Sequence, residues 1–141
     1  MFKIKYLEHT ADILFTINAN TFSELCKGAA TTTFESMANL KKVSPKITKK
    51  IKLKNKDYEK LLFDFIGELI YLKDAEYLLF SKFKIQIKKD KDSYVLNSEV
   101  LGEKINPKKH ELKVDVKAIT LHEFYVKKIK DQWKARIILD I

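Results

Sequence analysis

Two stretches of this sequence carry apolar residues at helical spacing, and each follows a residue that favours the start of a helix. Thr21 and Glu24 form a capping box, in which a hydroxyl and a carboxylate satisfy backbone donors at a helix start. The apolar stripe behind them predicts a helix that ends near Asn39. Asp57 can cap a second helix, whose apolar side chains between residues 61 and 70 form a stripe wide enough to lie across a sheet.

The rest of the chain mostly alternates apolar and polar residues, which is the pattern of strands with one buried face. Such segments lie at 3–7, 13–19, 47–53, 83–87, 94–97, 112–119, 124–129 and 133–141. The polar tract 88–93 between two of them predicts a hairpin. Because strands and helices do not alternate regularly, the fold class is expected to be α+β, with a mainly antiparallel β-sheet and two helices packed against it.

The chain has few of the residues that mark linkers or secreted proteins. Three glycines and two prolines in 141 residues leave no linker, so residues 1–141 are predicted to form one domain. No apolar run approaches the roughly 20 residues of a membrane span, and the N-terminus lacks an apolar signal region. The one cysteine, Cys26, cannot form an internal disulfide. We therefore expect a cytoplasmic protein without membrane contact.

The net charge is strongly positive. A formal charge of +9 favours contact with anions such as nucleic acid or an acidic partner. However, Arg136 is the one arginine among 28 basic residues, and arginine is the residue preferred for bidentate phosphate recognition. The lysines are spread along the chain in pairs, which is typical of a solvated surface. Direct RNA binding stays open, and a lysine-rich solvated surface is the preferred interpretation.

A polar segment between two predicted strands, residues 8–12, contains side chains that bind metals. Asp12 could supply an oxygen ligand for a hard cation, with His9 as a ligand or a supporting group. The alternative is an ordinary turn, in which aspartate and threonine side chains bond nearby backbone groups. From this segment alone the turn is the preferred interpretation.

The C-terminal end also brings carboxylates together. The apolar segment 136–139 is followed by Asp140 and then by Ile141, so a side-chain and a terminal carboxylate lie a few ångströms apart. Two such anions repel each other unless a cation or a basic side chain lies between them. Alternatively, the end frays and water solvates both groups. The composition does not decide between the two.

Other polar residues are weaker candidates. Lys117 shares a predicted strand face with Asp115, where it could contact a phosphate or an acidic partner, or simply be solvated. Glu35 could supply a third carboxylate or point outward, and His110 is expected at the surface or at a cap. The sequence contains no phosphate loop, nucleophile elbow or His-Glu-x-x-His helix, which favours an accessory protein over an enzyme.

Five blocks of the sequence resemble the archease family. They are residues 6–13, with Tyr6, Glu8, His9, Thr10, Ala11, Asp12 and Ile13; residues 24–37; residues 61–69; residues 102–122; and Leu139-Asp140-Ile141 at the end. They occur in the family's order over essentially the whole chain. Leu14 replaces a glycine that is frequent in the family, and Leu121 replaces an aromatic residue. Both departures leave the acidic positions intact.

This resemblance implies an α+β fold similar to part of a redox-regulated heat-shock chaperone. It also implies a non-enzymatic role in tRNA splicing, as an activator of the GTP-dependent RtcB-type RNA ligase that promotes its guanylylation and multiple turnover. In the family, one divalent cation, often calcium, is bound at positions matching Asp12, Asp140 and the terminal Ile141. Magnesium or manganese would suit the same oxygen ligands. His9, Glu35, Lys117 and His110 are candidates for supporting the site or contacting a partner.

Three other functions remain alternatives. The first is a chaperone or specificity modulator of a tRNA methyltransferase, for which the metal would be dispensable. The second is a metal-dependent hydrolase, although no nucleophile or general base is evident. The third is a plain RNA-binding module, for which RNA affinity would depend steeply on salt.

Overall fold

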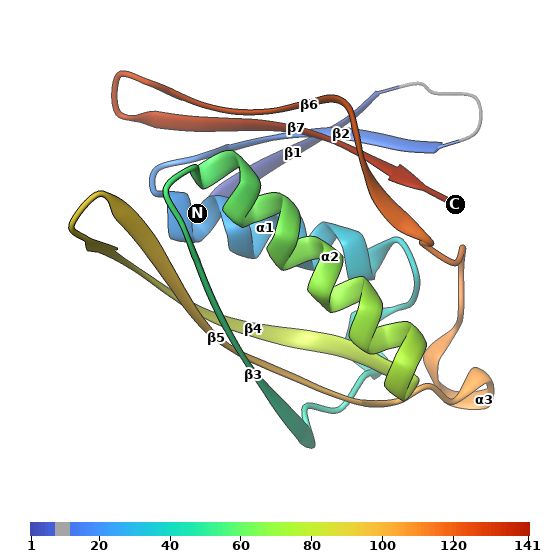
Figure 1. Ribbon diagram of the computed structural model, residues 1–141. Helices are drawn as coiled ribbons and strands as arrows, with labels where there is room; N and C mark the ends of the chain where they lie inside the picture. The colour runs from blue at the N-terminus through green and yellow to red at the C-terminus, as the bar shows by residue number, and fades with distance from the viewer. Residues whose placement is uncertain (8–11) are drawn as a thin grey trace.

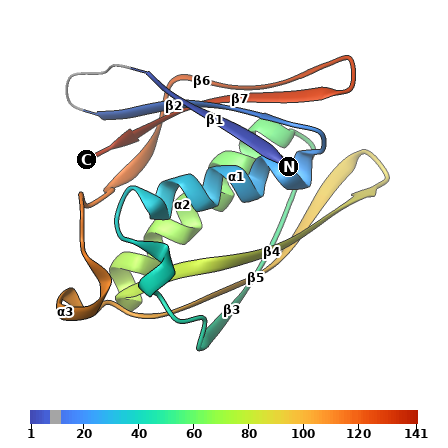
Figure 2. The same cartoon turned by 180° about the vertical axis from the view of Figure 1, so that it is seen from behind.

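The computed structural model describes residues 1–7 and 12–141, which form three layers. Two long helices lie between a four-stranded and a three-stranded sheet (Figure 1 and Figure 2). The strands are β1 (Phe2–Leu7), β2 (Asp12–Ala19), β3 (Ile47–Asn55), β4 (Leu78–Asp90), β5 (Ser93–Lys104), β6 (Ala118–Ile129) and β7 (Gln132–Asp140). The helices are α1 (Phe22–Glu35), α2 (Tyr58–Glu76) and the single turn α3 (Pro107–His110), with a 3₁₀ turn at Leu40–Lys42.

Both sheets are antiparallel throughout. The first has the strand order β1-β2-β7-β6, and the second has the order β3-β5-β4. The predicted α+β class, with antiparallel strands and two packed helices, is confirmed. The strands form two sheets, and the helices fill the space between them, so each helix buries apolar side chains toward both layers.

The two predicted helix starts are correct. The Thr21 hydroxyl accepts a 3.0 Å hydrogen bond from the Glu24 amide, and the Asp57 carboxylate accepts one of 2.8 Å from the Glu59 amide. The first helix ends at Glu35, earlier than expected, and the Ser36 hydroxyl donates back to a carbonyl of the last turn. Among residues 1–7 and 12–141, no helix is long and apolar enough to cross a membrane.

A close approach of two strands in the second sheet requires a glycine. Gly102 of β5 lies where β4 changes register between Phe80 and Lys82. A Cβ atom at residue 102 would lie 1.7 Å from the Leu79 carbonyl oxygen, a distance that no non-bonded pair tolerates. The bulge therefore depends on the missing side chain, and it lets Leu78, Leu79 and Phe80 all be buried.

The predicted strand 112–119 is wrong over most of its length. Residues 111–117 form a connection without a sheet partner, and β6 begins at Ala118. Backbone bonds to the end of α1 replace a ladder, because the Lys113 amide donates to the Met37 carbonyl at 2.8 Å and the Val114 amide donates to the Ser36 carbonyl at 3.3 Å. We call residues 111–117 the strap, because these bonds hold the segment across the end of α1.

Candidate functional site

The two aspartates singled out in the sequence lie opposite each other in the four-stranded sheet. Asp12 is the first residue of β2 and Asp140 is the last residue of β7, and they are paired in the β2–β7 register. Directly opposed residues project from the same face, with Cβ atoms about 4.5–5.5 Å apart. Asp140 is exposed and Asp12 is partly exposed. The two ends of the sequence therefore meet at one end of this sheet.

The chemistry of this corner fits a hard cation. Like charges directly opposed across two strands repel, and oxygen ligands around a divalent cation remove that repulsion. Ile141 follows Asp140 immediately and is 36% exposed. Among residues 1–7 and 12–141, no three side chains of histidine, cysteine, aspartate or glutamate come together as a metal site. The side-chain oxygens that the register brings together at this corner are those of Asp12 and Asp140.

The backbone of Lys117 contacts Asp140, one of the two paired aspartates. Its amide donates a 2.8 Å hydrogen bond to the Asp140 carbonyl, and the next residue, Ala118, pairs with Asp140 from β6. Its side chain is exposed. The expected face shared with Asp115 does not form, because residues 111–117 are not a strand and Asp115 binds Lys73 instead.

Glu35 ends helix α1 near strand β1. Burial raises the pKa of Tyr6, and the negative charge of Glu35 raises it further, whereas a hydrogen bond with Ser36 lowers it. The Lys113 ammonium donates to the Glu35 carbonyl oxygen at 3.1 Å, so the strap also reaches this point. The carboxylate of Glu35 is exposed next to the end of β1. His9, the remaining N-terminal candidate, lies outside the described residues.

His110 was expected at the surface or at a cap; the surface position is wrong, whereas its ring does bond the amide of Asn106, the N-cap residue of α3. The His110 side chain is 0% exposed. Its Nδ1 accepts a 2.9 Å bond from the Asn106 amide, so Nε2 carries the hydrogen and donates to Glu103 at 2.8 Å. A buried imidazole with both nitrogens bonded has a structural role in fixing the segment between β5 and α3. His110 is therefore not exposed for contact with a partner.

The carboxylate of Glu103 is the centre of this cluster. It accepts hydrogen bonds from Lys109 and from the Ser44 amide, both at 2.7 Å, in addition to the one from His110. These donors, with Lys109 first, then Ser44 and then His110, lower the pKa of Glu103 to about 2. The cluster joins β5, α3 and the segment before β3 into one unit.

Lys73 is a buried charged residue that sequence reasoning did not identify. Its side chain is 3% exposed, and its ammonium group contacts Asp115 at 2.5 Å, the Val116 carbonyl at 2.7 Å and Asp74 at 2.8 Å. It anchors the strap to α2. The signal in the sequence was its position, because Lys73 continues the helical spacing of Ile66, Leu69 and Ile70 on the buried face.

Comparisons with known proteins cover almost the entire chain. The Archease protein family matches residues 4–141. Protein archease of Thermococcus kodakarensis is 39% identical, over 100% of both chains. Protein archease of Pyrococcus furiosus is 37% identical, over 97% of each.

Solved structures agree with these sequence matches. The solution structure of a Methanobacterium thermoautotrophicum protein is 32% identical to this chain, covers 98% of both and superposes with a TM-score of 0.86. A crystal structure from Thermotoga maritima, described as that of an archease and possible chaperone, shares the fold at 22% identity, 97% and 96% coverage and a TM-score of 0.63. With a family match from residue 4 to residue 141, this chain belongs to the archease family.

Proposed function

We propose that this protein is a non-enzymatic activator of an RtcB-type RNA ligase in tRNA splicing, and that it acts through one divalent cation held by Asp12, Asp140 and the carboxylate of Ile141. The observation that supports the proposal is the register of the four-stranded sheet, in which the two aspartates are directly opposed. Membership of the archease family supports the accessory role.

The cation would supply a positive charge at an exposed corner, where it can attract phosphate groups. The chain's own residues hold that corner in place. Strand β7 has partners on both sides, and the Lys117 amide fixes the Asp140 carbonyl. Such a corner could enter the phosphate-binding cleft of the ligase and order GTP, metal or the histidine that becomes guanylylated. Calcium is the first candidate, and magnesium or manganese would fit the same oxygen ligands.

A single-turnover guanylylation assay of the ligase tests this proposal. Wild-type protein is expected to accelerate formation of the ligase–guanylate, and Asp140→Asn is expected to lose most of that stimulation, by at least about tenfold. Asp131→Asn is the matched control. Asp131 is exposed and lies in the turn between β6 and β7, at the opposite end of β7 from Asp140. Equal stimulation by the wild-type and Asp140→Asn proteins would refute the role of the cation.

A second candidate function is that of a chaperone or specificity modulator for a tRNA methyltransferase. The description of the Thermotoga maritima relative as a possible chaperone favours keeping it. This alternative expects the methyltransferase to stay soluble and to keep its specificity with wild-type protein and with Asp140→Asn alike. Asp140→Asn therefore distinguishes the two functions, because it should impair stimulation of the ligase and leave the effect on the methyltransferase unchanged.

A further inference from the structure

The outer face of the three-stranded sheet carries two rows of lysines. We call this set the lysine face; it consists of Lys50, Lys52 and Lys54 on β3 and Lys82, Lys84 and Lys88 on β4. All six side chains are exposed. They alternate with residues such as Ile51 and Phe83 that pack toward the helices, so the strand period directs the lysines outward.

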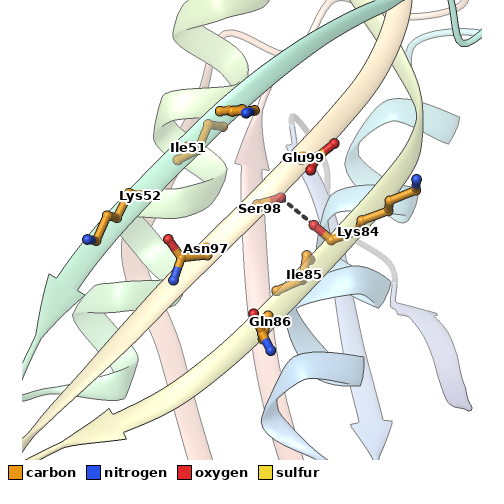
Figure 3. A pocket seen from close by; sticks show the side chains of 9 residues that line it. Ile51, Lys52, Lys84, Ile85, Gln86, Asn97, Ser98 and Glu99 are labelled. Atoms are coloured by element: carbon orange, nitrogen blue, oxygen red, sulfur yellow. Dashed lines mark hydrogen bonds between the residues drawn. The ribbon is translucent and has the colours of Figure 1, made fainter.

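The sheet register places the two rows on either side of β5. Lys50 and Lys84 flank Glu99, and in the next row Lys52 and Gln86 flank Asn97. Lysines two residues apart on one strand are separated by about 6.6 Å, and the two rows are about 9.6 Å apart across the central strand. Figure 3 views this face, with the side chains lying over the strands and the helices behind them. A hollow of about 550 Å³ lies between the rows.

Few carboxylates offset this charge. Asp90 binds Lys54 at 3.3 Å at one end of the sheet, and Glu99 lies in the middle. At the other end the Glu103 carboxylate is already bonded to Lys109, Ser44 and His110. Within the described part of the chain, no carboxylate oxygen lies within 4.0 Å of the ammonium group of the remaining five lysines, Lys50, Lys52, Lys82, Lys84 and Lys88. The face therefore carries a net positive charge, because six lysines outnumber Asp90 and Glu99.

The residues between the rows indicate what kind of anion fits. The outward residues of β5 are Val95, Asn97, Glu99 and Leu101, with no aromatic ring on which a base could stack. Lysines contact phosphates as point charges and read no sequence. Lysines on edge strands also discourage strand pairing, but that role does not require two parallel rows with a hollow between them. A flexible chain with regularly spaced phosphates matches two parallel rows of lysines on either side of β5.

We propose that the lysine face binds the phosphodiester backbone of RNA without sequence preference. The choice of RNA among nucleic acids rests on the proposed function, whereas the backbone contact rests on the charge and register of the sheet. The surface lies on the sheet that does not contain Asp12 and Asp140, so RNA and the ligase could contact different faces of the protein.

Fluorescence anisotropy with a labelled single-stranded RNA of about 16 nucleotides tests the proposal on the full chain alone. With about six phosphate contacts, the affinity is expected to fall about 300-fold between roughly 50 and 200 mM salt. Lys50→Gln with Lys84→Gln should weaken binding about 20-fold at roughly 0.1 M salt and lower the log–log salt slope by about 1.4. RNAs of different sequence should bind equally.

The matched control is Lys3→Gln with Lys134→Gln. These two exposed lysines flank Asn18 in one row on the outer face of the other sheet, and their loss removes the same charge. The control is expected to bind RNA like wild type.

An equal loss in both double variants, or no RNA binding at low salt, would overturn the proposal. So would polyglutamate of similar length binding as tightly as RNA, since the face would then suit an acidic polypeptide. The assay contains no ligase, so its failure is separate from failure of the guanylylation assay, which contains no RNA.

Discussion

His110 donates a 2.8 Å hydrogen bond to Glu103 from a fully buried imidazole, and this pair links α3 to the end of strand β5. The same carboxylate binds Lys109 and the Ser44 amide, so one acidic side chain holds three segments together. A polar cluster of this kind is costly when one member is removed, because the others lose their partners. The stability of the fold should therefore depend on the ionisation of Glu103.

Acid should weaken the protein through Glu103. The folded pKa of about 2 lies below the ordinary value of 4.5, so the contribution is complete above about pH 4.5 and is lost as the pH falls toward about 2. Urea unfolding of wild type and Glu103→Gln at several pH values is the measurement. We expect the variant to be less stable by about 2 kcal/mol near neutral pH. The gap should narrow below pH 4.5, and a gap that stays constant down to about pH 2 would contradict this role.

Two glycines should respond oppositely to the same substitution. Gly102→Ala places a methyl group against the Leu79 carbonyl and should destabilise the protein by about 3 kcal/mol. Gly67→Ala, inside α2, meets no atom within 4 Å and should stabilise it by about 0.5–1 kcal/mol. Thermal unfolding of both variants checks the pair. If Gly102→Ala unfolded at the same temperature as the wild type, that result would contradict the close approach of residue 102 to the Leu79 carbonyl.

Lys73 should control how firmly the strap is held. Lys73→Met leaves the Val116 carbonyl without its 2.7 Å donor and should cost about 2 kcal/mol. Hydrogen exchange at the amides of Lys113 and Val114, which bond the end of α1, should become faster. Lys60→Met on the exposed side of the same helix is the control, because its 3.7 Å pair with Asp64 contributes little. Unchanged exchange in Lys73→Met would mean that the backbone bonds alone hold the strap.

If the proposed cation binds, it should stabilise the fold. A ligand at about 100 times its Kd adds about 2.7 kcal/mol when it binds only the folded state. Titrating calcium, magnesium and manganese while following the melting temperature would rank the three metals. The shift should disappear in Asp140→Asn, and a residue appended after Ile141 should reduce it by removing the terminal carboxylate. An undiminished shift in Asp140→Asn would place any bound cation elsewhere.

The parts of the fold that follow from short-range chemistry could be predicted from the sequence. Both helix starts were found because Thr21 and Asp57 bond amides two or three residues away. The hairpin between β4 and β5 was found because a polar tract separates two alternating segments. The division into two sheets could not be predicted, since strand alternation states which face is buried and not which strands are neighbours.

The strap shows why alternation alone can mislead. Residues 112–119 alternate as a strand would, yet Lys113 and Val114 bond the end of α1 in place of a sheet ladder. At the candidate site, the sequence identified Asp12 and Asp140 as carboxylates, and the resemblance joined them into one site. The register now places them opposite each other. The burial of His110 could not be predicted, because it depends on Glu103 and Asn106, whose positions follow from the tertiary fold.

The position of β7 has a consequence for how the chain reaches this structure. The strand comes last in the sequence, yet it lies between β2 and β6. Pairing residue 12 with residue 140 requires closure of nearly the full chain, and such non-local contacts form slowly. Completion of the four-stranded sheet should therefore be a late kinetic event. Until then β2 and β6 lack their common neighbour and present open hydrogen-bonding edges, through which partly folded molecules would aggregate.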